Sequence, residues 1–198
     1  MQSKTTVPAT GKRSAGATRE RILEATNHLF YAQGIRATSA DRIIEEVGIT
    51  KVTFYRHFRS KSDLVVAYLA QQAQQESSWF SSLHQASDPV GSLDAIAAGI
   101  GTASCSPGFR GCAFINAAAE FSDPQDPVRE VVHTHRQWML DKFAEIASDA
   151  GTDDSQGVAR QLMMLRDGAM VNGYLGDPKS LEASLKSAFD AVLTAAIA

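Results

Sequence analysis

The stretch "SADRIIEEVGITKVTFYRHF", residues 39–58, decides the fold of the first part of this chain. It reads as a short helix, a turn that contains a glycine, and a second short helix. Thr38 or Ser39 can begin the first helix and Thr50 the second, because a side-chain oxygen there accepts a hydrogen bond from a free backbone amide. The glycine suits the left-handed conformation at which many helices end. This spacing predicts a helix-turn-helix.

The aromatic residues of the second helix fix how the two helices cross. Phe54 and Phe58 are four residues apart, so they share one face of the helix. We expect them to pack on Ile43, Ile44 and Val47 of the preceding helix. The remaining side chains of the second helix then point elsewhere. In a helix-turn-helix, the second helix enters the major groove of DNA.

The side chains left on the outside suit a nucleic acid. Small or polar residues at the start of the second helix can approach base edges closely, and a branched apolar residue there can meet a thymine methyl. Hydroxyl and cationic donors suit phosphate oxygens, as do the free amides at the start of the first helix. The candidate DNA-binding residues are Thr38, Ser39, Thr50, Lys51, Val52, Thr53, Tyr55, Arg56, His57 and Lys61.

The charge is distributed unevenly. Residues 1–63 contain 11 Lys and Arg against 6 Asp and Glu, a net charge of +5, whereas residues 64–198 have a net charge of −8. A basic first third on an acidic remainder suggests that one end contacts a polyanion, although the charge alone favours a solvated charged face. Residues 1–16 lack hydrophobic periodicity, and we expect a disordered basic tail.

The whole chain reads as helical. Strand-like alternation is absent, and apolar residues recur at helical spacing between turn signals such as "GDP" and "DPQDP". We therefore predict an all-α fold of about nine helices. The expected helices cover residues 18–33, 39–47, 51–57, 60–83, 89–103, 112–121, 127–150, 155–175 and 178–197, with Thr18 as the cap of the first.

Three features stand at set distances from one another along the chain: "FYAQG" at residues 30–34, Thr38 before the second helix, and Tyr-x-x-Phe-x-x-Lys at residues 55–61. Together they make residues 19–66 resemble the TetR family of bacterial transcriptional repressors. The resemblance covers about a quarter of the chain closely, and its motifs are specific in combination. Val52 is a departure, because the family usually has Gly or Ala at that position.

The resemblance implies phosphate contacts by Thr38, Tyr55, His57 and Lys61, and base contacts by residues 50–53. It also implies a homodimer formed by the last two helices, which matches a palindromic operator in double-stranded DNA. Domains are expected at residues 17–62 (helix-turn-helix) and 63–198 (effector binding and dimerisation).

The resemblance further implies a small-molecule pocket among the middle helices. The stretch "FRGCAFINAAAEF", residues 109–121, is the richest candidate, because a buried amide and carboxylate in an alanine-rich helix need partners that a ligand can supply. For each lining residue taken alone, ordinary core packing is the better explanation. The candidate ligand-binding residues are Trp79, Phe80, Phe114, Asn116, Glu120, His133, Trp138 and Met163.

Several classes of protein are disfavoured. No apolar run reaches the length of a membrane span, the N-terminus does not read as a secretory signal, and two cysteines suggest a reducing cytoplasm. No metal-binding or cofactor-binding motif is found, so no cofactor is expected. The main hypothesis is a dimeric repressor that a small-molecule effector releases from its operator.

Two alternatives remain open. Cys112 can act as a redox or electrophile sensor with Cys105, activated by Arg110, although an inert pair of small apolar residues is the simpler interpretation. A small helical enzyme that uses Glu120 or His133 is less well supported, because no catalytic constellation accompanies them.

Overall fold

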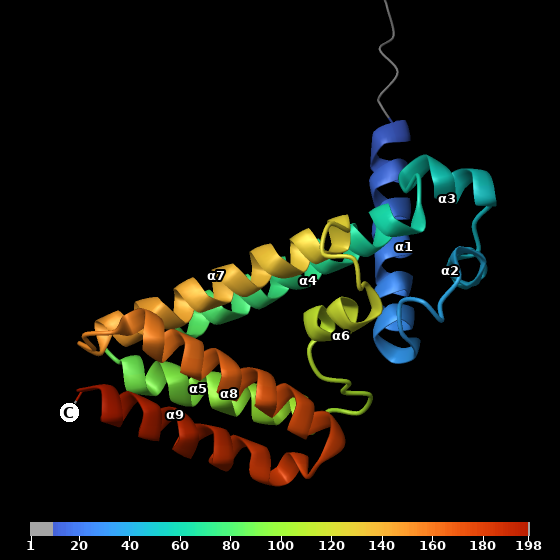
Figure 1. Cartoon of the computed structure of the whole chain (residues 1–198). Helices are drawn as coiled ribbons and strands as arrows, with labels where there is room; N and C mark the ends of the chain where they lie inside the picture. The colour runs from blue at the N-terminus through green and yellow to red at the C-terminus, as the bar shows by residue number, and fades with distance from the viewer. Residues whose placement is uncertain (1–9, 198) are drawn as a thin grey trace, which may run out of the picture. The chain divides into compact units, whose positions relative to one another are not determined.

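The structure is a computed structural model that describes residues 10–197. Within this range it contains helices and no strand, so the predicted all-α fold is confirmed (Figure 1). The α-helices are α1 (Thr10–Gln33), α2 (Ala40–Val47), α3 (Lys51–His57), α4 (Lys61–Leu83), α5 (Pro89–Ser104), α6 (Ala113–Glu120), α7 (Pro127–Asp149), α8 (Ser155–Leu175) and α9 (Leu181–Ile197), with a 3-10 turn at Pro178–Ser180.

The chain forms two compact units, Met1–Tyr68 and Leu69–Ala198. Helix α4 belongs to both, because the division falls inside it. The predicted domain boundary lies slightly earlier, between residues 62 and 63. The two units are described separately below.

The turn between α2 and α3 is built by the capping residues that the sequence indicated. The Ser39 hydroxyl accepts a hydrogen bond from the Arg42 amide at 3.1 Å, and the Thr50 hydroxyl accepts one from the Thr53 amide at 3.2 Å. Gly48 ends α2 with φ +68°, a left-handed conformation that costs residues with a Cβ atom about 1–2 kcal/mol. Local chemistry alone therefore specifies this turn.

The core of the first unit joins all of its helices. Phe54 is fully buried and Phe58 nearly so, together with Ile43 and Val47 of α2, whereas Ile44 is only half-buried. From α1 and α4 the core receives Ile22, Leu29, Phe30, Leu64, Val65 and Tyr68, and the rings of Phe30 and Tyr68 meet edge to face.

A polar contact adds to this packing at the end of α2. The Arg21 guanidinium of α1 donates a hydrogen bond to the Val47 carbonyl at 2.6 Å. Carbonyls in the last turn of a helix have no partner within the helix, so this bond supplies one. The positive charge of Arg21 also interacts favourably with the negative, C-terminal end of the α2 dipole.

The predicted start of the first helix is wrong. Helix α1 begins at Thr10, and Thr18 lies inside it rather than at its cap. The residues before Thr18 include Lys, Arg and Ala, which are good helix formers, and no proline interrupts them. The helix therefore includes the end of the stretch predicted as a tail, and residues 1–9 of that tail lie outside the described residues.

The second unit is a helical bundle around one apolar core. Helix α7 packs on α8, and α9 packs on both α5 and α8, as Figure 1 shows. The predicted Asp-Pro breaker begins α7, because the Asp126 carboxylate accepts a hydrogen bond from the Val128 amide at 2.8 Å. The last predicted helix is divided instead, since Pro178–Ser180 form a 3-10 turn before α9.

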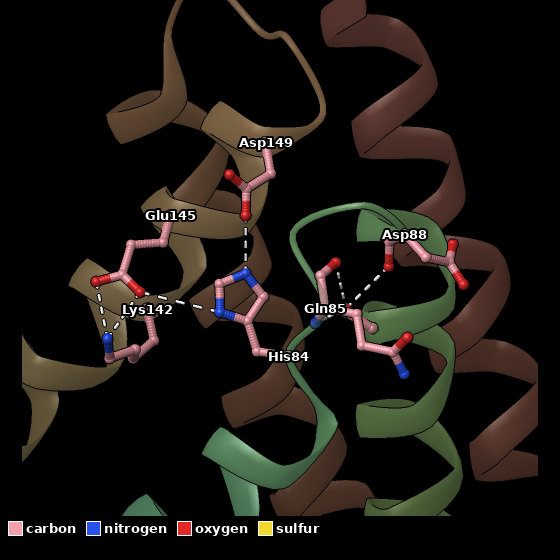
Figure 2. A network of polar contacts seen from close by, with 7 residues as sticks. His84, Gln85, Asp88, Lys142, Glu145 and Asp149 are labelled. Atoms are coloured by element: carbon pink, nitrogen blue, oxygen red, sulfur yellow. Dashed lines mark hydrogen bonds and ion pairs between the residues drawn. The ribbon is translucent and has the colours of Figure 1, made fainter.

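Polar contacts fasten the end of α4 within this unit (Figure 2). His84 Nε2 lies 2.8 Å from the Asp149 carboxylate at the end of α7. One residue further on, the Gln85 amide donates to the Ser92 hydroxyl at 2.9 Å, and that hydroxyl donates to the Asp88 carbonyl at 2.9 Å. These contacts define the turn from α4 into α5.

Candidate nucleic-acid interface

Helix α3 has an apolar inner face and an exposed outer face. Phe54 is fully buried, whereas Val52 is 71% exposed and Tyr55 is 41% exposed. Arg56 is also exposed, and the Tyr55 ring stands edge to face on Phe54 at 5.2 Å. The burial of one face thus presents an aliphatic, a phenolic and a cationic side chain together on the other.

The polar side chains at the start of α3 bind one another. The Thr50 and Thr53 hydroxyls are 2.9 Å apart, and the Lys51 ammonium lies 2.9 Å from the Asp41 carboxylate. The hydrogen bond and charge of Asp41 raise the pKa of Lys51 above its ordinary value. Lys51 is therefore a paired cation on the surface, and the two threonines brace the first turn of the helix.

Thr38 has a structural role that the sequence did not indicate. Its side chain is 1% exposed, and its hydroxyl donates to the Gly34 carbonyl at 2.9 Å. We therefore assign this hydroxyl to closing the connection between α1 and α2 rather than to a phosphate. Ser39 is exposed and occupied as the cap of α2.

The remaining candidates lie at the end of α3 and the start of α4. His57 is half-buried in the last turn of α3. The Lys61 ammonium lies 3.5 Å from the Arg36 carbonyl and 6.0 Å from the centre of the Phe30 ring. Tyr55, Arg56 and Lys61 thus place a phenol and two cations within a short span around the α3–α4 junction.

Comparison with known proteins identifies this arrangement. Residues 22–68 match the family model described as "Bacterial regulatory proteins, tetR family". The chain is also similar to the crystal structure of SCO4454, a TetR-family transcriptional regulator from Streptomyces coelicolor, with 39% identity and a TM-score of 0.88. That likeness covers 92% of this chain and 97% of the other.

The chain belongs to the TetR family of transcriptional regulators.

Further relatives agree with this membership. A putative TetR-family regulator from Streptomyces avermitilis is 25% identical, with a TM-score of 0.77 over 88% of this chain and 97% of that one. An HTH-type transcriptional regulator of Staphylococcus aureus is 43% identical over 53 residues. This last match spans 27% of this chain and only 29% of the relative.

The comparisons also bear on the excluded classes. Since these relatives are transcriptional regulators rather than enzymes, they set the enzyme alternative aside. No helix among the described residues is long and apolar enough to cross a membrane. In the same part of the chain, no group of three or more His, Cys, Asp or Glu residues is arranged to hold a metal ion.

The structure separates the candidate ligand-binding residues of this TetR-family chain. Phe80 and Met163 lie in the core of the second unit, where the Phe80 ring meets the rings of Trp138 and Phe143 at 5.7 Å each. Trp79 is partly buried and fills the space that a side chain at Gly99 would need. Ordinary core packing accounts for these positions.

The polar candidates differ more from expectation. The Asn116 amide donates to the Arg110 carbonyl at 2.9 Å, so it closes the loop before α6. Glu120 is half-buried at the end of α6, and His133 is exposed on α7. The buried histidine of α7 is His135, two residues further on.

A largely buried charge cluster lies beside Phe114 and Trp138, two of the predicted pocket residues. Glu76 of α4 lies between two basic side chains: its carboxylate is 2.8 Å from His135 Nε2 on α7 and 2.5 Å from Arg166 Nη2 on α8. The Asp167 carboxylate in turn contacts Arg166 at 3.2 Å and Arg136 at 2.7 Å. One carboxylate thus joins three helices.

Aromatic rings enclose the histidine of this cluster. The His135 ring stacks on Phe114 of α6, with centroids 3.6 Å apart and planes 11° apart. Trp138 lies beside the histidine as well, with centroids at 5.4 Å. Two of the candidate ligand-binding residues, Phe114 and Trp138, therefore flank the charge cluster.

The cluster shifts the pKa values of its members. Burial of Glu76 favours the neutral acid, but the hydrogen bond to His135 and the charge of Arg166 outweigh it, so the pKa of Glu76 lies below its ordinary value. Burial lowers the pKa of Arg166, but its interactions with Cys112, Glu76 and Asp167 raise it by more, so the pKa lies above its ordinary value. Both groups are thus held charged at neutral pH.

The same contact revises the interpretation of the cysteines. Arg166, not Arg110, is the cation that interacts with Cys112, while the Arg110 guanidinium lies over the Tyr174 ring at 5.6 Å. Cys105 is exposed, Cys112 is buried, and both are free thiols. Because reactive cysteines need access as well as a cationic neighbour, the burial of Cys112 favours the inert interpretation.

Sequence reasoning missed most of the cluster. Arg166 carried a signal, because it interrupts the apolar stripe of α8, where a charge has to find a partner. Glu76 carried none, because it stands between two glutamines and two serines in a polar stretch of its helix. His135 also carried a signal, because it lies at helical spacing with the apolar residues Val128, Val132 and Met139, whereas His133 shares a face with Glu130 and Gln137.

Replacing Glu76 tests the energetic role of the cluster. We expect Glu76→Gln to lower the free energy of unfolding at pH 7 by about 3 kcal/mol, because it leaves Arg166 buried with less compensating charge. The measurement is urea denaturation followed by circular dichroism. Asp153→Asn, a change at an exposed turn residue, should alter the free energy of unfolding by less than about 0.5 kcal/mol.

The pH dependence provides a second readout. The folded-state pKa of Glu76 lies below the unfolded one, so its stabilising effect is complete at neutral pH and is lost as pH falls through the folded pKa. The stability gap between wild type and Glu76→Gln should therefore shrink in acid. A gap that stays constant from pH 7 to pH 3 contradicts this assignment.

Proposed function

We propose that this TetR-family chain is a dimeric transcriptional repressor that a small-molecule effector releases from a palindromic DNA operator. The observation that carries the proposal is the outer face of α3, where Val52, Tyr55 and Arg56 are exposed while Phe54 is buried. A helix with this division, preceded by a capped α2 and a glycine turn, has the form of a recognition helix.

Docking on DNA uses phosphate contacts to position α3. The Tyr55 hydroxyl and the cationic groups of Arg56 and Lys61 are the donors that this surface offers to phosphate oxygens. Backbone amides at the start of α2 add a further anion site. Base contacts then come from the first turn of α3, at Thr50–Thr53.

Dimerisation uses the outer faces of α8 and α9. Three apolar side chains form a stripe along α8, with Met164 66% exposed, Val171 45% exposed and Leu175 73% exposed. Gly168 lies within the stripe and lets another helix approach closely. The exposed residues of α9 beside its buried stripe are mostly small: Ala183, Ser184, Ser187, Ala191, Thr194 and Ala195.

Two arguments favour pairing with a second copy over simple exposure. Contiguous apolar surface on a folded chain marks an interaction site more often than a solvated face. A two-fold symmetric pair also presents two recognition helices, as a palindromic operator requires.

Effector release is proposed to act through α4. This helix begins with Lys61, a candidate phosphate donor, and carries Glu76, which is fixed by α7 and α8 in the second unit. An effector that binds near Phe114 and Trp138 changes the surroundings of His135 and so the hold on Glu76. Coupling of this kind is reciprocal, so operator DNA weakens effector binding by the same factor.

Two substitutions test the DNA-docking assignment. Tyr55→Phe removes one hydrogen-bond donor and should weaken binding about fivefold without changing the salt dependence. Lys61→Ala should weaken binding and also reduce the slope of log K against log salt concentration by about 0.9, because one phosphate contact is lost. The measurement is filter binding to a duplex selected from a random library by the full-length chain.

A matched control separates docking from general charge. Lys142→Ala removes a lysine of α7 that pairs with Glu145 in the second unit, and it should leave both affinity and slope unchanged. If the curves for Tyr55→Phe and Lys61→Ala both overlay wild type, the docking assignment is wrong.

A charge placed in the α8 stripe tests the dimer. Met164→Glu should convert the protein from a dimer to a monomer, because the carboxylate would be buried without a partner at the interface. Sedimentation equilibrium measures the association state. Thr134→Glu, at an exposed position of α7, should leave the dimer intact. A wild-type protein that is monomeric, or a Met164→Glu protein as dimeric as wild type, overturns the interface.

A further inference from the structure

We propose that Val52 reads the C5-methyl group of a thymine in the operator and so determines one base of the recognised sequence. The inference rests on the proposed DNA binding and adds to it the chemistry by which one position is read. It is carried by the exposure of Val52 and by the internal pairing of the polar groups around it.

Val52 has no role in the fold that explains a valine. It is 71% exposed on a helix whose packing is supplied by Phe54, and it contributes nothing to the buried core of the first unit. Valine is also a poor helix former, because its branched side chain loses rotamer freedom in a helix. Alanine or a charged residue would serve an exposed helical position better.

The neighbouring polar groups already have partners within the protein. The Thr50 hydroxyl accepts a hydrogen bond from the Thr53 amide and lies 2.9 Å from the Thr53 hydroxyl. The Lys51 ammonium is held by Asp41 at 2.9 Å. The first turn of α3 therefore offers the exposed aliphatic side chain of Val52 beside hydroxyl and ammonium groups that have partners within the protein.

The major groove contains one apolar group that matches this surface. The four base pairs present hydrogen-bond donors and acceptors on their major-groove edges, and thymine adds the C5-methyl group. Burying one such group against valine methyls is worth about fourfold in affinity by the transfer free energy of a single carbon. The contact is thus a thymine at a fixed position of each half-site.

The test removes the thymine methyl without changing base pairing. In the duplex selected from a random library by the full-length chain, each thymine is replaced in turn by deoxyuridine, and Kd is measured for every duplex. Wild type should lose about fourfold at one position of each half-site. Val52→Ala should bind the thymine and deoxyuridine duplexes equally at that position.

Two controls isolate the contact. Tyr55→Phe should bind every duplex more weakly but keep the deoxyuridine sensitivity, because it leaves Val52 in place. Val52→Ala should unfold at the wild-type urea midpoint or above it, since the valine is exposed, which shows that any loss of binding is local.

The possible outcomes distinguish failure of the Val52 contact from failure of the proposed DNA binding. If the chain selects no duplex at all, the proposed DNA binding fails and Val52 has nothing to read. If a duplex is bound but no single deoxyuridine weakens wild-type binding, or Val52→Ala keeps the sensitivity, the Val52 inference is overturned while DNA binding stands.

Discussion

The burial of Phe54 and Phe58 in the core of the first unit is the constraint on which the DNA-facing surface depends. Both rings lie in a core that also receives Ile43 and Val47 of α2, so the crossing of the two short helices is set by apolar packing. A helix of only seven residues is not stable alone, and its orientation comes from this packing. The outward direction of Val52, Tyr55 and Arg56 follows from it.

The second unit relies on a different interaction. Most of its core is aliphatic and aromatic, yet Glu76, His135 and Arg166 form a buried charged contact among α4, α7 and α8. Buried ion pairs contribute little net stability against an apolar replacement, but removing one partner is costly. We therefore interpret the cluster as a device that specifies one arrangement of these helices.

Local chemistry explains which parts of the fold could be predicted. The caps at Ser39 and Thr50 and the glycine turn at Gly48 depend on a few adjacent residues, and the structure has them as expected. The prediction that α1 begins at Thr18 was wrong because a threonine caps a helix only where the preceding residues are not helical, and here they are. The prediction of one helix over residues 178–197 missed the 3-10 turn at Pro178–Ser180, since a proline is compatible with either kind of first turn.

The site was predictable only where one face of one helix decides it. The outer residues of α3 follow from the spacing of two phenylalanines, whereas Thr38 turns out to be buried by contacts with the preceding connection. The apolar spacing of α7 distinguishes His135 from His133, but Glu76 and His135 are brought together from distant parts of the chain. Long-range packing decides which of these residues meet, and the pattern of a single sequence does not show that packing.

Protection of guanine N7 atoms from dimethyl sulfate on the selected duplex tests the central claim most directly, because N7 lies in the major groove. The account predicts protected guanines in two symmetric half-sites about one helical turn apart, one for each copy of α3. Unprotected guanines on a duplex that the protein binds, or protection confined to one half-site, would contradict it.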